Sequence, residues 1–251
     1  GYARAKRRQQ IFVATSSVGP GATNMVTAAA VAMSNRLPIL FLHGDTYANR
    51  IPDPVLQQVE HFNNPGITAN DAFKPVTRYF DRITRPEQII QSFPAAVQTM
   101  LDPADCGPAC IALSQDIQGQ TFDYPEEFFK EKVHAIRRPR PDEFQIKEAA
   151  EKIKSSKNPI IISGGGVFYS DAMEDLSNFA IKHNIPVTQT VMGYSTMKRD
   201  HSHYAGQIGG LGGKNTNSLA KQTDLAIAVG TKLADFTTGS WANFENENFK
   251  L

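Results

Sequence analysis

The sequence predicts an α/β protein made of two parallel-sheet, three-layer domains. Short apolar runs rich in β-branched residues alternate with longer stretches of helix-forming residues, and the alternation restarts after a proline-rich, charged interruption. Strands that alternate with helices form mostly parallel sheets with helices on both faces. We therefore expect one domain over residues 1–118, a linker over residues 119–142 and a second domain over residues 143–251.

The first half opens with an apolar run at residues 11–15, which predicts a buried strand. A Gly-Pro-Gly turn then leads into residues 22–34, which are rich in Ala, Met and Val and predict a helix. Pro86 suits the first turn of another helix that reaches about residue 100, with a kink or a break expected at Pro94. The other expected elements are strands at residues 38–43 and 108–113 and an extended or turning segment at residues 74–79.

The second half repeats the alternation. Asp142 is placed to cap a helix that reaches residues 155–156. A glycine-rich segment occupies residues 206–213. The other expected elements are a strand at 159–163, a helix at 171–183, a short strand at 185–188, a helix at 215–222 and a strand at 225–229.

Composition narrows the possible partners. The 251 residues include 26 Lys and Arg against 25 Asp and Glu, for a formal net charge of +1. This balance gives no reason to expect a nucleic acid or an anionic membrane as a partner. No apolar run is long enough to span a bilayer. With only two cysteines, Cys106 and Cys110, we expect a reduced, cytoplasmic protein, although a disulfide or a metal pair stays open.

The turn at Gly19, Pro20 and Gly21 is the strongest local signal for a binding site. Glycine adopts backbone geometry that other residues avoid, and without a Cβ it lets a ligand approach the main chain. Proline stiffens the turn, and the N–H groups at the start of the following helix point into the same space. The turn therefore predicts either a cofactor cradle or a plain strand-to-helix connection.

Loops that follow the predicted strands of the first half lie at residues 19–24, 43–46 and 114–116. In open parallel sheets, ligands bind at the carboxyl ends of the strands. His43 and Asp45 could form an acid–base pair at this edge. The simpler interpretation, which the spacing alone favours, is that Asp45 caps a loop and His43 packs at a strand end.

Weaker signals occur elsewhere. Gly164–Gly166 follows a strand, as a dinucleotide phosphate turn does, but the G-x-G-x-x-G spacing and the acidic partner are missing. Residues 206–213 could likewise let the main chain approach a phosphate. His201 and His203 are expected in a solvated loop rather than at a metal. The basic cluster at residues 137–140 is expected to be a solvated linker, with an anion-binding patch as the alternative.

Gly1–Ala5 and Thr15–Asn24 resemble the thiamine diphosphate-dependent enzymes of the acetolactate synthase type. In that family these residues mark the pyrimidine-binding domain. Residues 159–166 and 223–231 are similar to the family's Rossmann-like central domain. The resemblance implies that the first domain is truncated at its N-terminus and the second at its C-terminus, so that the chain is a fragment.

Two segments, Pro52–Gln58 and Asn70–Gln88, resemble one branch of this family. That branch opens the ring of trihydroxycyclohexane-1,2-dione by C–C hydrolysis, giving 5-deoxyglucuronate in myo-inositol breakdown. Acetolactate synthases typically have Gly-Gln and Thr-Lys where this chain has Gly-Asp at residues 44–45 and Thr-Arg at residues 77–78. The resemblance implies a thiamine diphosphate-dependent hydrolase of a small cyclic diketone. A carboligase of the acetolactate synthase type and a non-catalytic dinucleotide-binding module are the alternatives.

The resemblance also implies which residues meet the cofactor and the substrate. Gly19, Pro20 and Asn24 are expected near the aminopyrimidine ring of thiamine diphosphate, with Asp45 at its edge. Arg78 takes the place of a substrate-channel lysine. We expect it to pair with a polyhydroxylated or anionic intermediate, or otherwise with an acid at the surface. No catalytic residue and no metal ligand is expected within this chain.

Other parts of the family's active site lie in segments that this sequence does not match. The catalytic glutamate lies shortly upstream of Gly1, and a Gly-Asp-Gly…Asn motif of a third domain holds Mg²⁺ and the diphosphate. We therefore expect the chain alone to be inactive and to bind thiamine diphosphate weakly or not at all. The central domain holds FAD in some members, and we expect none here. Because the family builds its active site between subunits, we expect a homodimer or homotetramer of the full enzyme.

Overall fold

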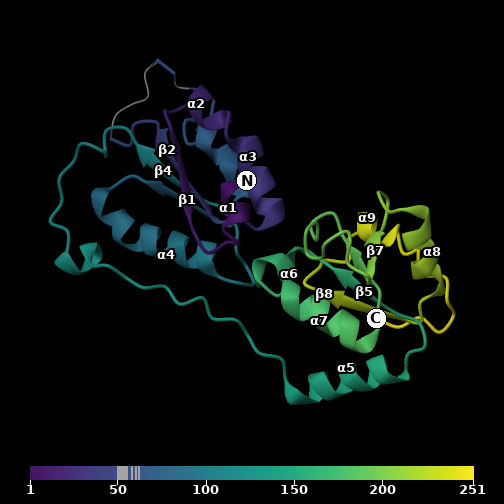
Figure 1. Ribbon diagram of the computed structural model, residues 1–251. Coiled ribbons are helices and arrows are strands. Elements are labelled where there is room, and N and C mark those ends of the chain that lie inside the picture. The colour runs from purple at the N-terminus through teal and green to yellow at the C-terminus, as the bar shows by residue number, and fades with distance from the viewer. Residues whose placement is uncertain (50–55, 58, 60, 62) are drawn as a thin grey trace. The chain divides into compact units, whose positions relative to one another are not determined.

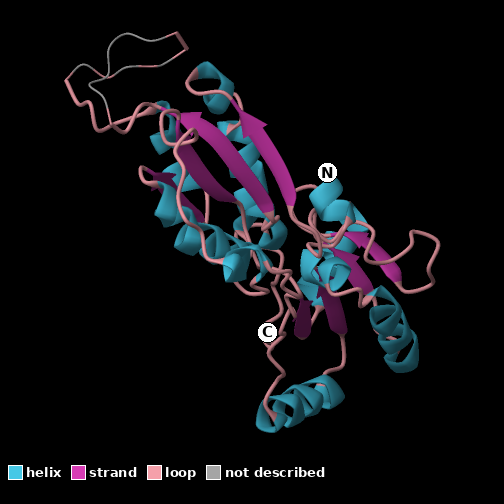
Figure 2. Cartoon of the chain, turned by 90° about the vertical axis from the view of Figure 1, so that its left-hand side faces the viewer, coloured by secondary structure: helices cyan, strands magenta, loops and turns pink. Residues whose placement is uncertain are grey.

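A computed structural model describes residues 1–49, 56, 57, 59, 61 and 63–251. Most of Pro52–Gln58 lies outside the described residues. The chain divides into two compact units, residues 1–138 and 139–251. Within the described residues, each unit contains a four-stranded parallel sheet with helices packed against it (Figures 1 and 2), which confirms the predicted α/β class.

The sheet of the first unit has the strand order β1-β2-β4-β3, and each pair of neighbours is parallel. β2 and β4 lie in the middle of this sheet and are the most buried strands. The strands are β1 (Phe12–Ser16), β2 (Ile39–Asp45), β3 (Tyr79–Ile83) and β4 (Ala109–Ser114). The α-helices are α1 (Tyr2–Ala5), α2 (Pro20–Thr23), α3 (Val26–Asn35) and α4 (Ile89–Leu101), and the 3-10 helices are η1 (Ala69–Val76), η2 (Pro86–Gln88) and η3 (Glu126–Phe129).

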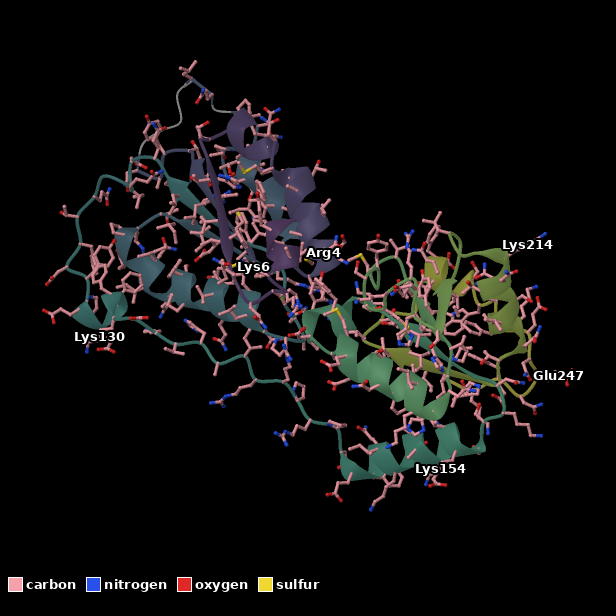
Figure 3. The ribbon with its side chains drawn as sticks, viewed as in Figure 1. Arg4, Lys6, Lys130, Lys154, Lys214 and Glu247 are labelled. Carbon is pink, nitrogen blue, oxygen red and sulfur yellow. The ribbon has the colours of Figure 1, made fainter. Side chains whose placement is uncertain are left out.

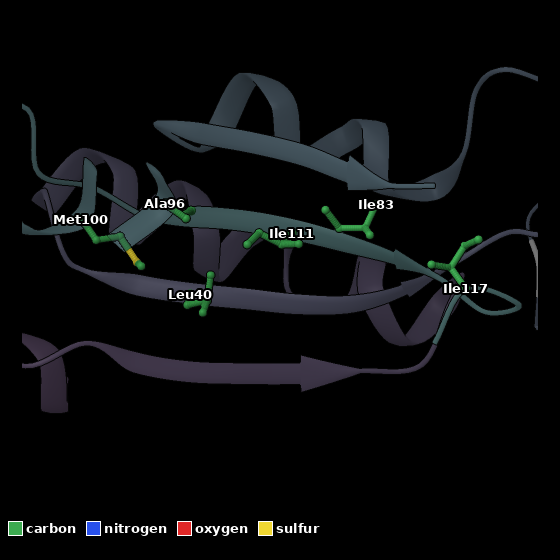
Figure 4. Packing of buried hydrophobic residues seen from close by; sticks show 7 residues of the cluster. Leu40, Ile83, Ala96, Met100, Ile111 and Ile117 are labelled. Carbon is green, nitrogen blue, oxygen red and sulfur yellow. The ribbon is translucent and has the colours of Figure 1, made fainter. Parts of the chain in front are cut away.

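Apolar layers cover both faces of this sheet, as the three-layer prediction requires. On one face α4 packs against β3 and β4 (Figure 4), and the buried residues there include Leu40, Ile83, Ala96, Met100 and Ile111. On the other face α2, α3 and η1 close a second layer with Ala22, Ala29, Phe41, Phe73 and Cys110. The two layers fix the carboxyl ends of the strands, from which the candidate site is built.

Two expectations for the helices of the first unit are corrected by the structure. Residues 22–34 form parts of two helices instead of one, because the Met25 amide bonds to the Ala22 carbonyl oxygen (2.9 Å) and closes a tighter turn between α2 and α3. α4 continues through Pro94, so of the two alternatives expected there, a kink or a break, the break is absent. The buried inner face of α4 offsets the single backbone hydrogen bond that a proline cannot donate.

The sheet of the second unit has the order β7-β6-β5-β8, again with parallel neighbours. Buried residues of α7 pack on one face of it and those of α8 on the other. The strands are β5 (Pro159–Ser163), β6 (Val187–Gln189), β7 (Tyr204–Gln207) and β8 (Leu225–Val229). The helices are α5 (Glu143–Ser155), α6 (Gly165–Tyr169), α7 (Met173–His183), α8 (Lys214–Gln222) and α9 (Asp235–Thr238).

Among the described residues, no helix combines the length and the apolar character that crossing a bilayer requires.

Candidate functional site

The turn after β1 lies at the carboxyl edge of the first sheet, as the strand–turn–helix pattern predicts. Gly19 has a φ of 67° and caps α2, and Pro20 takes the first helical position. The left-handed φ favours glycine, and a proline in the first turn loses no helical hydrogen bond. The local sequence therefore explains the shape of the turn, and its place in the sheet is where parallel sheets bind ligands.

Gly44, near the end of β2, lets this turn approach the sheet closely. A Cβ at residue 44 would lie 3.1 Å from the Val18 nitrogen, so a larger residue would push against the turn. The Ser16 Oγ atom, at the end of β1, lies 2.8 Å from His43 Nδ1 of β2. The base of the turn is thus fixed to both β1 and β2.

Pro20 and Asn24 are exposed on the turn, whereas Gly19 is buried. The Pro20 ring offers apolar surface, and the Asn24 amide offers both hydrogen-bond donors and an acceptor. These groups suit an aminopyrimidine, which has flat apolar faces and polar ring atoms. The described residues contain no group of three or more His, Cys, Asp or Glu that could hold a metal ion.

His43 is fully buried, with the rings of Phe41 and Phe73 centred 5.7 and 4.6 Å from its imidazole. Burial lowers the pKa of His43 from 6.5 to about 4, so the imidazole is neutral near pH 7. Its Nε2 atom has no hydrogen-bond partner among the described residues. Because the Asp45 carboxylate has other partners, this geometry favours a packed histidine over an acid–base pair.

Asp45 ends β2 with a fully buried carboxylate. Its Oδ2 atom accepts a hydrogen bond from Arg82 Nε at 2.6 Å, and its Oδ1 atom accepts one from the Thr46 amide at 2.8 Å. A buried carboxylate is tolerated only with such partners. Asp45 thus lies at the same edge as the turn, but its carboxylate is engaged with Arg82.

Arg82, in β3, is the residue of this edge that sequence reasoning missed. Its Nη2 atom donates to Asp71 Oδ1 at 3.0 Å and to Thr68 Oγ1 at 2.8 Å. Burial alone would lower the pKa of Arg82, but the hydrogen bonds and charges of Asp45 and Asp71 raise it above its ordinary value. The available signal is the pair of charged residues, Asp81 and Arg82, inside the otherwise aromatic and apolar segment Tyr79–Ile83.

A second carboxylate fixes the chain that leaves β2. Asp116, which follows β4, accepts hydrogen bonds from the backbone amides of Ala48 and Asn49 at 2.9 and 2.8 Å. Desolvation would raise the pKa of Asp116, but these amide bonds lower it below its ordinary value. The loops after β2 and β4 are therefore joined at the carboxyl edge.

Arg78 lies at the amino end of β3, away from the other predicted site residues. Its amide donates to the Pro108 carbonyl oxygen at 2.8 Å, just before β4 begins, and its Nη1 atom lies 3.3 Å from Asp105 Oδ1. Because β3 and β4 are parallel to the other strands, this is the edge opposite the turn. The structure brings the turn and Asp45 to one edge and places Arg78 at the other, in an ion pair with an exposed acid.

The glycines after β5 are explained by packing within the second unit. A Cβ at Gly164 would lie 2.4 Å from the Gly230 carbonyl oxygen, and one at Gly166 would lie 2.6 Å from Gly230 Cα. The loop after β8 therefore fills the space beside this turn, which a bound phosphate would need. This packing explains the glycine run without a dinucleotide.

His201 and His203 have partners within the second unit. The His201 Nε2 atom lies 2.8 Å from Ser177 Oγ, and the His203 Nε2 atom lies 3.1 Å from Asn184 Oδ1. These bonds hold the loop before β7 against α7 and against Asn184, the C-cap residue of that helix. Both histidines therefore have a structural role.

Charged side chains elsewhere in the described part of the chain are mostly exposed (Figure 3), and some of them pair with near neighbours in the sequence. The Lys130 ammonium lies 2.5 Å from Glu127, and that of Lys154 lies 2.9 Å from Glu151. Exposed pairs of this kind contribute little to stability. The ionic network around Arg82 differs because it includes a fully buried carboxylate.

Two family models match the chain. The thiamine pyrophosphate enzyme N-terminal TPP binding domain matches residues 1–64, and the thiamine pyrophosphate enzyme central domain matches residues 146–251. The first match contains the turn and Asp45, and the second contains both glycine-rich segments.

Curated relatives match along almost the whole chain. It is 51% identical over 245 residues to the 3D-(3,5/4)-trihydroxycyclohexane-1,2-dione hydrolase of Clostridium perfringens (strain 13 / Type A), covering 98% of this chain and 38% of that protein. Hydrolases of the same name from Clostridium tetani and Listeria monocytogenes are 50% and 46% identical, over 100% and 97% of this chain and 39% and 38% of their own lengths. The chain therefore spans less than two fifths of these relatives.

A solved structure supports the fold. The benzoylformate decarboxylase of Polynucleobacter necessarius superposes with a TM-score of 0.74 over 99% of this chain and 42% of that chain, at 20% sequence identity. At this identity the likeness concerns the fold alone. Together, the two domain models and the relatives show that the chain belongs to the thiamine pyrophosphate enzymes.

Proposed function

We propose that this chain is part of a thiamine diphosphate-dependent hydrolase that opens the ring of trihydroxycyclohexane-1,2-dione to 5-deoxyglucuronate in myo-inositol breakdown. The observation that carries the proposal is the exposure of Pro20 and Asn24 on a turn at the carboxyl edge of a parallel sheet, within the residues that match a TPP-binding domain. The substrate class is taken from relatives about half identical to the chain and named as hydrolases of that dione.

In this proposal the residues at the carboxyl edge bind and orient the cofactor. Gly19 lets the main chain approach the aminopyrimidine, Pro20 covers one of its faces and Asn24 bonds to its polar atoms. The buried Asp45 carboxylate lies at the edge of the site and is bonded to Arg82. Thiamine diphosphate, when bound, supplies the nucleophilic carbon for attack on a carbonyl and accepts the electrons of the broken C–C bond. Arg78 meets the substrate only if the substrate also reaches the amino edge of the sheet.

Other parts of the activity are assigned to segments outside this chain. We expect the catalytic glutamate and the ligands of Mg²⁺ and the diphosphate to come from the rest of the full-length protein, a cytoplasmic homodimer or homotetramer that acts on a small molecule. The observation that supports this division is that the chain spans 38% of the length of a relative. The chain alone should then show no turnover.

The test is an assay of the full-length protein with the cyclic dione, and separately with pyruvate, in the presence of thiamine diphosphate and Mg²⁺. We expect cofactor-dependent formation of 5-deoxyglucuronate and no acetolactate. Asn24→Ala should raise the cofactor Kd about tenfold, or about 1.4 kcal/mol, and Thr27→Ala, at an exposed position of α3, should not.

Other outcomes would replace the proposal. Acetolactate formation without ring opening would make the protein a carboligase. A flavin or nicotinamide absorption spectrum without turnover would make it a dinucleotide-binding module. Turnover by the isolated chain, or micromolar cofactor binding to it in calorimetry, would contradict the assignment of the remaining parts to other segments.

A further inference from the structure

Arg82 connects the elements that surround the turn at residues 19–24. Its side chain is 22% exposed, and its Nε atom donates to Asp45 Oδ2 (2.6 Å) at the end of β2. Its Nη2 atom donates to Asp71 Oδ1 (3.0 Å) in η1 and to Thr68 Oγ1 (2.8 Å), which caps η1. One guanidinium therefore fixes both ends of the chain that connects β2 to η1.

η1 supports the turn at residues 19–24 in two ways, through its packing against α2 and through a hydrogen bond to Gly44. Phe73 of η1 and Ala22 of α2 are fully buried in one apolar cluster, and α2 packs against η1. The fully buried Asn70 donates from Nδ2 to the Gly44 carbonyl oxygen at 2.9 Å. The Val18 nitrogen lies against that same glycine. A displacement of η1 would therefore shift α2 directly. It would also shift the base of the turn, through the bond between Asn70 and Gly44.

The first residues of η1 are themselves locked in place. The Thr68 amide donates to Asp71 Oδ2 at 2.7 Å, and together with the Thr68 side chain this forms a capping box. Desolvation would raise the pKa of Asp71, but its bonds to Lys74, to the Thr68 amide and to Arg82 lower it. Arg82 thus meets a charged and rigid partner in η1.

We propose that Arg82 is a positioning residue for the cofactor turn, holding α2 with Pro20 and Asn24 in place through η1 and Asp45 without touching the cofactor. The inference rests on the proposed function, because it assumes that the turn binds thiamine diphosphate. A guanidinium donates in several fixed directions, whereas an ammonium is a compact point charge. Lysine at position 82 would keep the charge that balances the carboxylates and lose the geometry, so the two contributions can be separated.

The experiment compares Arg82→Lys and Arg82→Gln with the parent in the full-length protein. The matched control is Arg85→Lys, because Arg85 follows the same strand but is 70% exposed, with Glu87 as an exposed partner at 3.6 Å. Two quantities are measured: the Kd for thiamine diphosphate by calorimetry, and hydrogen exchange of α2 and η1 peptides without cofactor. For Arg82→Lys we expect about tenfold weaker binding and about tenfold faster exchange at both helices, and for the control a change of less than about twofold in each.

Each outcome decides the proposal. Unchanged exchange of α2 and η1 in Arg82→Lys would overturn it, whatever the cofactor affinity. Faster exchange with a Kd within about twofold of the parent would also overturn it, since the turn would then bind without Arg82. A parent protein that does not bind thiamine diphosphate would refute the proposed function instead, and the exchange data would still decide whether Arg82 positions α2. If Arg82→Gln fails to fold, Arg82→Lys carries the test alone.

Discussion

The buried imidazole of His43 should make the first unit sensitive to acid. Burial lowers the pKa of His43 to about 4 in the folded chain, whereas an exposed imidazole titrates near 6.5. Between these values the unfolded chain binds more protons than the folded chain. By linkage, the corresponding stabilisation is complete above about pH 6.5 and is lost as the pH falls through about 4.

The size of the effect follows from the shift. A fall of the pKa from 6.5 to about 4 corresponds to roughly 3 kcal/mol of unfolding free energy, lost between about pH 6.5 and about pH 4. His43→Gln removes the titrating group and keeps an amide that can bond to Ser16. We expect the variant to be less stable than the parent at neutral pH, because it loses contacts with Phe41 and Phe73. On acidification it should lose roughly 3 kcal/mol less than the parent.

The assay is a urea titration of the full-length protein at several values between about pH 7 and about pH 4. Unfolding of the first unit is read by thiol labelling of Cys110, which is buried in the same cluster as Phe41, with mass spectrometry of its peptide. His183→Gln, at an exposed position of α7, is the control and should keep the acid dependence of the parent. Equal losses in the parent and in His43→Gln would refute the reasoning from burial.

Three further changes test the packing of the chain. Gly164→Ala places a Cβ 2.4 Å from a carbonyl oxygen of a neighbouring loop and should cost roughly 1–3 kcal/mol by thermal unfolding, whereas Gly119→Ala meets nothing within 4 Å and should cost less. Ile162→Ala empties a fully buried site and should cost roughly 2–5 kcal/mol by urea unfolding, more than the same change at the exposed Ile181. Asp142→Ala removes the N-cap of α5 and should cost about 1 kcal/mol of protection in hydrogen exchange of that helix. A variant that matches its control, or a cap variant with unchanged exchange, would contradict the packing described for that site.

Most of the fold could be predicted because its central strands are buried on both faces. Residues 38–43 and 108–113 are nearly continuous apolar runs, and they became β2 and β4. β3 was missed because its centre carries Asp81 and Arg82. Their charges are tolerated there because Ser92 donates to Asp81 and Arg82 pairs with carboxylates, which are partnerships that no local pattern reveals.

The candidate site was predictable in position but not in its connections. Gly19 and Pro20 indicate a turn because of their own backbone preferences, a permitted left-handed φ for glycine and a fixed φ for proline. The position of the turn after β1 could therefore be predicted from the sequence. The bond between Asp45 and Arg82 joins residues 37 positions apart and depends on the strand order. Arg78 lies only four residues before Arg82 but at the opposite edge of the sheet. It precedes the first residue of β3, whereas Arg82 lies near the carboxyl end of that strand.

The place where the cofactor binds is best established by a map of the full-length protein with bound thiamine diphosphate, from crystals or by cryo-electron microscopy. We expect the aminopyrimidine ring in contact with Pro20 and Asn24 at the carboxyl edge of β1 and β2, with Arg82 bonded to Asp45 behind it. A ring bound at any other edge of the first unit, or one that touches neither Pro20 nor Asn24, would refute cofactor binding at this turn.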